Sequence, residues 1–261
     1  MKRIIVTLAI AASLVFAACA QKPTVDSVVN KMVQTYGGAE KLAAIQDQVS
    51  TWDGKMVMPQ GDSIVTVAAE MIITYKRPNK IKFETKGSDG TTVMASGFDG
   101  ANGWMLMMGQ AKDMSPAEIQ ENTTLAETWI DQWHNYSQKG MKLAMSADTT
   151  MNGKTYHVIQ VTDRFNNVSK NFCDPQTGLV ERMEGEGTDP ASGQKQTFSM
   201  TFADPAPHDG FMMPKKVTSY DAQGNMAFEL TLKDTKHNTG VADDVFAKPT
   251  MSMTMENPNA Q

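Results

Sequence analysis

The chain has 261 residues, of which 41% are hydrophobic and 20% charged, and its formal net charge is −5. This length and apolar content suffice for one large β domain or two ordinary domains with a real core. The acidic balance argues against nucleic-acid binding, because such sites need clustered Lys and Arg. The unusual feature is methionine, with 21 residues beside only two cysteines and 7% aromatics.

The first residues are typical of a bacterial secretion signal. Lys2 and Arg3 precede an apolar run over 4–18 that ends in small residues. The run is too short to span a bilayer comfortably. The residues from Phe16 to Cys19 resemble a lipobox, in which the cysteine is lipidated, although Phe16 replaces the usual Leu. Ordinary cleavage after residue 18 is the alternative, and it would leave Cys19 as a free thiol in an oxidising compartment.

These signals predict a protein held on a membrane by its N-terminus. Two or three acyl chains, at about 0.8 kcal/mol per buried methylene, suffice for a stable anchor. Ala20 follows Cys19 where the best-known inner-membrane retention signal has Asp, so we expect the periplasmic side of the outer membrane. The predicted segments are a signal peptide (1–18), a lipidated tether (19–24), one domain (25–249) and a flexible tail (250–261).

Helical patterns come first in the predicted domain and recur once later. Gly37-Gly38 ends a first helix, and a short second helix follows over 39–45. Ser115-Pro116-Ala117-Glu118 combines an N-cap serine, a proline at N1 and a capping-box glutamate, which predicts a further helix ending near Asn135. Its two tryptophans are expected to pack on a sheet face. The apolar stripe of the first helix is Val25, Val28, Val29, Met32, Val33 and Tyr36.

From residue 49 onward, apolar and polar residues alternate with the period of a β-strand. Asn, Asp and Gly in the connections supply the backbone conformations of tight hairpins. The fold class is therefore mainly β (α+β), with an antiparallel sheet of about eleven strands. The strand candidates are 51–58, 63–75, 80–85, 91–98, 103–108, 154–162, 168–173, 179–185, 195–202, 213–220 and 226–233.

The sequence contains no recognisable catalytic or metal-binding constellation. The nucleophile elbow, the phosphate-binding loop and the dinucleotide-binding motif are all missing. Cys173 lies where a strand runs into a turn and is expected to be a buried structural thiol. We therefore expect no enzyme activity, no cofactor and no metal. Four histidines are scattered without zinc-ligand spacing: His134, His157, His208 and His237.

The methionine excess leaves three interpretations open. Flexible, polarizable thioethers suit a groove that must fit many apolar shapes. A Met-rich core is the simpler alternative. The spacing of Met251, Met253 and Met255 could offer soft ligands to Cu(I), but no neighbouring histidine or cysteine supports a copper site.

Several short motifs resemble the outer-membrane lipoprotein-sorting family, the LolA/LolB-like carriers of Gram-negative periplasms. The segment from Tyr36 to Leu42 is similar to the broader relatives of this family rather than to the soluble carrier. The lipobox is more similar to the membrane-anchored receptor. The remaining matches are Tyr75-Lys76-Arg77-Pro78-Asn79, Phe83-Glu84, Asp99-Gly100 with Trp104, Asp174 with Thr177-Gly178-Leu179-Val180, Asp209-Gly210 with Pro214, and Asp243-Asp244-Val245-Phe246.

The resemblance implies an incomplete antiparallel barrel whose concave, apolar face is covered by helices. It also implies that acyl chains enter this face and that the helices act as a movable lid. The arginine that holds the family's lid by hydrogen bonds falls on Arg77, for which a strand-end charge before a turn is the alternative. Residues 180–205 are polar along one face, which puts them in doubt as groove walls. Related folds occur in envelope-stress sensors and glycolipid carriers, so the cargo stays open.

The first hypothesis is a lipid-anchored periplasmic binding protein that holds the acyl chains of a lipid or lipoprotein in a hydrophobic groove, for outer-membrane lipoprotein sorting or transport. An envelope-stress sensor or assembly factor with a protein partner is the alternative. A periplasmic enzyme using Glu181, Glu184 and Glu186 is a weaker third. A one-residue register error would exchange the two faces of any strand. The candidate lining and lid residues are Trp52, Met56, Met58, Met71, Ile73, Phe83, Met94, Trp104, Leu106, Met108, Trp129, Ile130 and Trp133.

Overall fold

The structure is a computed structural model that describes residues 22–60, 63–107, 109–188 and 195–249. The predicted signal peptide, Cys19, the copper hypothesis at Met251 to Met255 and the predicted tail lie outside these residues. The helices within them are α1 (Val25–Tyr36), α2 (Ala39–Ala44), α3 (Pro116–Thr128), η1 (Tyr136–Lys139) and η2 (Asp243–Phe246). The strands are β1 (Asp47–Gln60), β2 (Ser63–Lys76), β3 (Lys80–Lys86), β4 (Thr92–Phe98), β5 (Gly103–Met107), β6 (Gln110–Asp113), β7 (Lys142–Met145), β8 (Thr149–Met151), β9 (Lys154–Thr162), β10 (Val168–Cys173), β11 (Val180–Thr188), β12 (Lys195–His208), β13 (Phe211–Tyr220) and β14 (Met226–His237).

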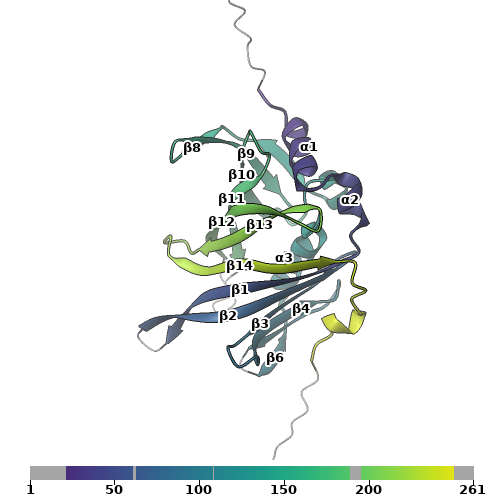
Figure 1. The fold of residues 1–261 in the computed structure, drawn as a ribbon, viewed down its shortest axis with the longest axis vertical. Coiled ribbons are helices and arrows are strands. Elements are labelled where there is room, and N and C mark those ends of the chain that lie inside the picture. The colour runs from purple at the N-terminus through teal and green to yellow at the C-terminus, as the bar shows by residue number, and fades with distance from the viewer. Residues whose placement is uncertain (1–21, 61–62, 108, 189–194, 250–261) are drawn as a thin grey trace, which may run out of the picture.

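The strands form one long, strongly curved antiparallel sheet (Figure 1). Its order is β6-β5-β4-β3-β2-β1-β14-β13-β12-β11-β10-β9-β7, with β8 paired to β9. Strands β6 and β7 stand at opposite ends of this order, so the barrel is not closed. The mainly β fold class is therefore confirmed. Among the described residues the sheet has fourteen strands, and the three that the sequence did not predict, β6, β7 and β8, are too short to show a clear alternation.

The apolar residues of the sheet's inner face form two core clusters. The first joins the strand residues Ile159 and Val161 to Met32 of α1 and to α2. The second includes Trp52 and Ile73 and packs against α3. Helices α1 and α2 lie beside one end of the sheet in Figure 1. The three helices thus cover the concave face, and the face that they cover is the apolar one.

Helix α1 forms and docks as its sequence dictates. Thr24 is its N-cap and accepts a hydrogen bond from the Ser27 amide at 3.2 Å. Its stripe at helical spacing is buried against the sheet. Two side chains then fasten it to the turn between β10 and β11, since Lys31 donates to the Pro175 carbonyl and Thr35 to the Thr177 carbonyl, both at 2.6 Å. The helix is therefore held by its apolar face and by polar contacts at its side.

Helix α3 begins where its capping box predicts and ends sooner than expected. Ser115 and Glu118 exchange both capping-box hydrogen bonds. The helix stops at Thr128 rather than near Asn135. The hydroxyl of Thr128 bonds back to the Thr124 carbonyl, and the Asp131 carboxylate accepts from the His134 amide, which favours a turn over a further helical turn. The predicted end of this helix was wrong by about two turns.

Within the described residues, no helix combines the length and the apolar character needed to cross a bilayer.

Candidate functional site

A cavity of about 210 Å³ lies between the helices and the concave face of the sheet. Helices α1 and α2 line it with Val33, Tyr36 and Leu42. The sheet contributes Val180, Met183 and Phe202, together with Asn171 and Pro214. The remaining wall is the chain from Thr128 to Trp133. The lining is predominantly apolar and aromatic, as in sites for small apolar ligands.

The residues from 116 to 133, which we call the covering segment, bridge the two core clusters. Trp129 packs against the second cluster and meets the Phe83 ring edge-on, with centroids 5.7 Å apart and planes at 86°. Ile130 and Trp133 pack instead on the first cluster. The covering segment therefore closes the cavity by placing its aromatic side chains in both halves of the concave face.

Side-chain polar contacts fasten the covering segment to the rest of the molecule. Thr124 donates to the Asp163 carboxylate at 2.9 Å, and Glu127 forms an ion pair with Arg164. Both partners lie in the turn between β9 and β10. The buried carboxylate of Asp131 interacts with Lys139, and burial lowers the pKa of Lys139 while Asp131 raises it. These fastenings are side-chain contacts, unlike the backbone ladders of the sheet.

Arg77 holds the end of α2 beside the cavity. Its Nε donates to the Ile45 carbonyl, and its Nη2 donates to the Leu42 carbonyl at 2.8 Å. Both carbonyls stand at the C-terminal, negative dipole end of α2, where the Leu42 carbonyl also accepts from the Ile45 amide at 3.4 Å. The guanidinium therefore ties a covering helix to the strand end that carries Arg77.

The structure places most of the predicted lining residues on the concave face. Trp52 and Ile73 are buried in the second cluster, with Met71 and Phe83 packed against it. The register also puts Met94 on this side, because it pairs with Thr85, which pairs with Met71. Met56 shares the side of Trp52 and pairs with Phe228. The three that line the cavity itself are Trp129, Ile130 and Trp133. The Met58 side chain and Met108 lie outside the described residues.

Trp104 and Leu106 were assigned to the wrong face. Phe98, of the second cluster, pairs with Gly103, so the next residue Trp104 pairs with Gly97 and points to the other side. There the indole covers Gly97, and its Nε1 donates to the Phe246 carbonyl at 2.8 Å. Leu106 pairs with Ala95 on the same outer side. The tight turn between β4 and β5 fixes how the two strands pair. Because side chains alternate between faces along a strand, a shift of one residue in this pairing exchanges the two faces.

Several lining residues were not predicted. The stripe of α1 that contains Val33 and Tyr36 was visible as a helical core stripe but was not linked to the cavity. On β11, Val180 and Met183 stand among charged residues, so the sequence shows no apolar alternation that would mark them as lining residues. A bulge opposite Phe172 and Cys173 brings both to the same face, since Cys173 pairs with Val180 and Asn171 pairs with Met183. Periodicity alone does not reveal such a bulge.

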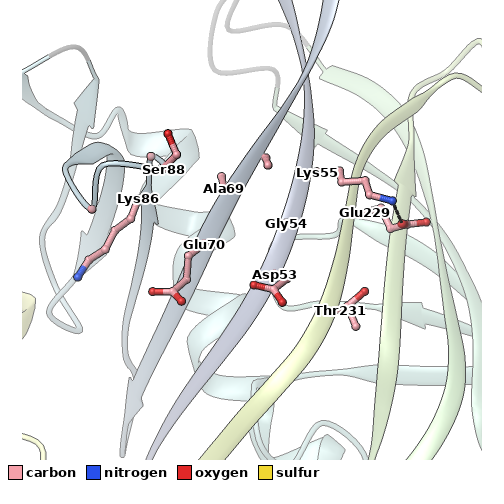
Figure 2. Close-up of a pocket in the computed structure, with 12 residues that line it drawn as sticks. Asp53, Gly54, Lys55, Ala69, Glu70, Lys86, Ser88, Glu229 and Thr231 are labelled. Atoms are coloured by element: carbon pink, nitrogen blue, oxygen red, sulfur yellow. Dashed lines mark hydrogen bonds and ion pairs between the residues drawn. The ribbon is translucent and has the colours of Figure 1, made fainter.

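A larger, open hollow of about 520 Å³ lies on the outer face of the sheet (Figure 2). Its lining is charged, and most of these charges are paired: Lys55 meets Glu229 at 3.2 Å, and Lys216 meets the other oxygen of Glu229 at 2.6 Å. Lys233 lies between Asp53 and Glu70, at 3.3 and 3.1 Å. A solvated array of paired charges offers no apolar surface to a lipid chain, so the smaller inner cavity is the better candidate.

The reactive side chains of the described residues are engaged structurally. Cys173 is buried with its Sγ 3.8 Å from the Met32 Sδ, and burial raises its pKa to about 12. Burial also raises the pKa of Tyr36 to about 12, and its hydroxyl accepts from the Val180 amide at 3.1 Å. Glu181 pairs with Lys154 at 2.6 Å. No group of three His, Cys, Asp or Glu side chains in this part of the chain could hold a metal ion.

The sequence matches no family model and no curated protein. Solved structures, by contrast, match over almost the whole described chain. A LolA superfamily protein from Nitrosomonas europaea aligns with a TM-score of 0.56 at 14% identity, covering 87% of this chain and 98% of that one. A putative outer membrane lipoprotein-sorting protein domain from Vibrio parahaemolyticus aligns with a TM-score of 0.53 at 16% identity, covering 85% and 95%.

The chain has the LolA-like fold. A DUF1329 family protein from Desulfovibrio piger shares it as well, with a TM-score of 0.54 at 9% identity, covering 86% of this chain and 97% of that one. In the LolA-like fold of this chain, the sheet is open, helices lie on its concave face, and the cavity lies between the helices and that face.

Proposed function

We propose that this protein is a non-enzymatic binding protein of the cell envelope that shelters an acyl chain of a lipid or lipoprotein on the concave face of its sheet. In this proposal Cys19 is lipidated and anchors the protein to the outer membrane, facing the periplasm. The covering segment acts as the lid. The LolA-like fold supports the proposal, as do the names of two of its structural neighbours, one from the LolA superfamily and one a putative lipoprotein-sorting domain.

The observation that carries the proposal is the split of the concave core into two clusters, which are joined through the covering segment and through Phe202 of β12. An ordinary β-sandwich core would be one continuous block of interlocked strand residues. Here Trp129 belongs to one cluster and Trp133 to the other, with the cavity between them. Displacing one short segment would therefore open both clusters at once without breaking any strand pairing.

The size of the cavity indicates that the described state is closed. At about 210 Å³ it exceeds the roughly 150 Å³ of an engineered apolar cavity that accepts benzene. It is smaller than the roughly 300–1,000 Å³ typical of drug-sized ligand sites. A full acyl chain fits only if the covering segment moves away. The gain would come from apolar burial, at about 25 cal/mol for each Å² of lipid surface removed from water.

In this proposal Arg77 holds α2 in place, so that α2 does not move with the covering segment. Its two hydrogen bonds keep α2 against the strands while the covering segment moves. Charge-assisted hydrogen bonds are roughly twice as strong as neutral ones, and here both acceptors belong to one helix end. These two hydrogen bonds support the expectation that Arg77 holds a covering helix.

Uptake of a fluorescent acyl probe tests the function, together with native mass spectrometry of protein purified without detergent. We expect a co-purifying lipid and saturable uptake. In Met183→Trp the larger side chain fills the cavity, so uptake should fall about tenfold or more while the fold is kept. Val93→Trp is the matched control, because Val93 is 47% exposed on β4, and it should bind the probe normally. Equal uptake by both variants would contradict the proposed site.

A further inference from the structure

A series of hydrogen-bonded buried polar groups, here called the relay, connects the covering segment to an exposed carboxylate in the turn between β12 and β13. The indole Nε1 of Trp129 donates to Gln48 Oε1 at 2.8 Å. Gln48 Nε2 lies 3.2 Å from both Thr235 Oγ1 and His237 Nε2. His237 Nδ1 lies 3.1 Å from the carboxylate of Asp209. Gln48 and Thr235 are buried, as is the His237 side chain at 4% exposure, whereas the Asp209 side chain is 60% exposed.

The donors and acceptors of the relay allow only one arrangement while His237 is neutral. The Asp209 carboxylate is an acceptor, so His237 carries its proton on Nδ1 and its Nε2 accepts. The two hydrogens of the Gln48 amide then go to Thr235 and His237, whose acceptors lie closer than the third neighbour of this nitrogen, the Met213 Sδ at 3.9 Å. This leaves Gln48 Oε1 for the Trp129 indole, which can only donate. Every donor and acceptor that links Trp129 to Asp209 then has a partner, as buried polar groups must.

Protonation of His237 makes this arrangement impossible. An imidazolium donates from both nitrogens, so its Nε2–H would point at the Gln48 amide hydrogens. Turning the amide over gives the imidazolium an acceptor, but it then presents the Gln48 amide hydrogens to the Trp129 indole N–H. Neither orientation of one amide satisfies two donors on opposite sides. The hydrogen bond to Trp129 and the charge on His237 therefore exclude one another.

The surroundings of His237 permit this change of charge. The Asp209 carboxylate contacts the ring at Nδ1 and is itself exposed to solvent, which gives the proton a route to the ring. Lys41 of α2 approaches the same turn, with its Nζ 3.8 Å from where a Gly210 Cβ would lie. On the adjacent strand, the Asp47 carboxylate is occupied by the amides of residues 239–241. The other charged or titratable neighbours are Lys236, paired with Asp234 at 3.7 Å, and His208 in the β12–β13 hairpin.

We propose that Gln48 is the positioning residue of the lid, and that protonation of His237 releases Trp129 and loosens the covering segment. The proposal rests on the proposed function in assigning a lid role to this segment. It makes acyl-chain exchange faster when His237 is protonated than when it is neutral. Loss of one such hydrogen bond corresponds to about a threefold to tenfold change in the opening equilibrium.

NMR of the full chain labelled with ¹⁵N-tryptophan tests the relay from Trp129 through Gln48 and His237 to Asp209 without any ligand, because it reports the indole N–H signals. Trp129→Phe assigns the signal, and the indoles of Trp52 and Trp104, bonded to Ser50 and to the Phe246 carbonyl, serve as internal references. We expect the Trp129 signal to be protected from exchange with water at pH 8 and exposed at pH 5. This transition should follow the ring signals of His237. A Trp129 indole that stays protected at both pH values would overturn the proposal.

Variants separate the relay from a general effect of acid. His237→Gln places a non-titrating acceptor at this position and should keep Trp129 protected at pH 5. Gln48→Glu should do the same, because a carboxylate accepts from both donors. The matched control is His157→Gln, since His157 also lies 3.1 Å from a carboxylate, that of Asp148, but has no link to the covering segment. If His157→Gln abolished the transition, or if both relay variants kept it, the relay would be wrong.

The same variants in the acyl-probe assay distinguish the two proposals. We expect the parent chain to take up the probe about threefold to tenfold faster at pH 5 than at pH 8, and His237→Gln to show no such change. Uptake that is equal at both pH values contradicts the relay and leaves the proposed function intact. Absence of uptake at every pH contradicts the proposed function, while the Trp129 indole signal still decides the relay.

Discussion

The Asp47 carboxylate ties the first strand to the C-terminal end of the domain. It is buried and accepts hydrogen bonds from the amides of Thr239, Gly240 and Val241 and from the Thr239 hydroxyl, at 2.7 to 3.3 Å. Burial raises the pKa of this carboxyl, but the hydrogen bonds together outweigh burial, and the pKa lies below its ordinary value of 3.8. The charged form is thus the one that the fold stabilises.

This carboxyl predicts a pH dependence of stability with a definite sign. Because its folded pKa is depressed, its contribution is fully present above about pH 4, the ordinary range of an unfolded Asp, and is lost as the pH falls through the folded value. Asp47→Asn should lower the free energy of unfolding by about 2 kcal/mol at pH 7 and by less at pH 3. Urea titrations at the two pH values measure the difference. An equal loss at both would contradict this account of Asp47.

Gly97 is required by the close approach of Trp104. A Cβ on Gly97 would lie 2.6 Å from the indole, which is itself held by its hydrogen bond to the Phe246 carbonyl. Gly97→Ala should therefore destabilise the protein by about 1–3 kcal/mol, as overpacking does. Gly187→Ala is the control, since a Cβ there would meet its nearest neighbour at 3.4 Å. Thermal or urea unfolding of both variants checks the prediction, and a similar loss in both would contradict it.

At the scale of elements, the turn between β9 and β10 is the dock for α3. Asp163 accepts from the amides of Phe165 and Asn167 and from the Asn167 side chain, which shapes the turn. Its remaining bond comes from Thr124 of α3. Asp221 accepts the same set of turn hydrogen bonds, from Gln223 and Asn225. Within the described residues, these hydrogen bonds stay inside its own turn and do not reach a helix. The comparison isolates what Thr124 adds.

Removing the Thr124 hydroxyl should loosen α3 without unfolding the sheet. In Thr124→Val we expect amide exchange in residues 116–133 to increase by about tenfold, because a hydrogen bond to a charged group contributes roughly 1.5–3 kcal/mol and this site is partly solvated. Exchange in β1, β2 and β14 should be unchanged. Asp221→Ala, the control, should affect only its own hairpin. Faster exchange throughout the sheet in Thr124→Val would contradict a local role.

The elements show how far sequence reasoning reaches. Capping residues and alternation predicted the start of α3 and the antiparallel sheet, because these signals are local, whereas the open barrel was implied by the family resemblance. The face of Trp104 was missed because it depends on one residue of register set by the preceding turn. Val180 was missed because a bulge shifts it, and Gln48 because a polar residue in a strand gives no sign of the tryptophan that it will meet. Each of these depends on contacts between distant parts of the chain.

The whole molecule combines a rigid sheet with a cover held mainly by side chains. Its continuous ladder of paired strands runs from β6 to β7 and leaves the helices as separate pieces on the concave face. The methionines divide accordingly. Met32 and Met141 are core residues of the first cluster, Met71 and Met200 pack at the edge of the second, and Met183 lines the cavity. The core interpretation of the methionine excess therefore applies to Met32, Met141, Met71 and Met200, whereas the groove interpretation rests on Met183 and stays a prediction.

Photo-crosslinking tests the central claim that an acyl chain enters the concave face. A fatty acid with a photoreactive group near its terminal methyl would be bound, irradiated and its attachment sites located by peptide mass spectrometry. We predict attachment within residues 128–133 and beside Met183 and Phe202, and its loss in Met183→Trp. Attachment confined to the charged outer face around Lys55 and Glu229 (Figure 2), or no attachment in the described domain, would contradict the account.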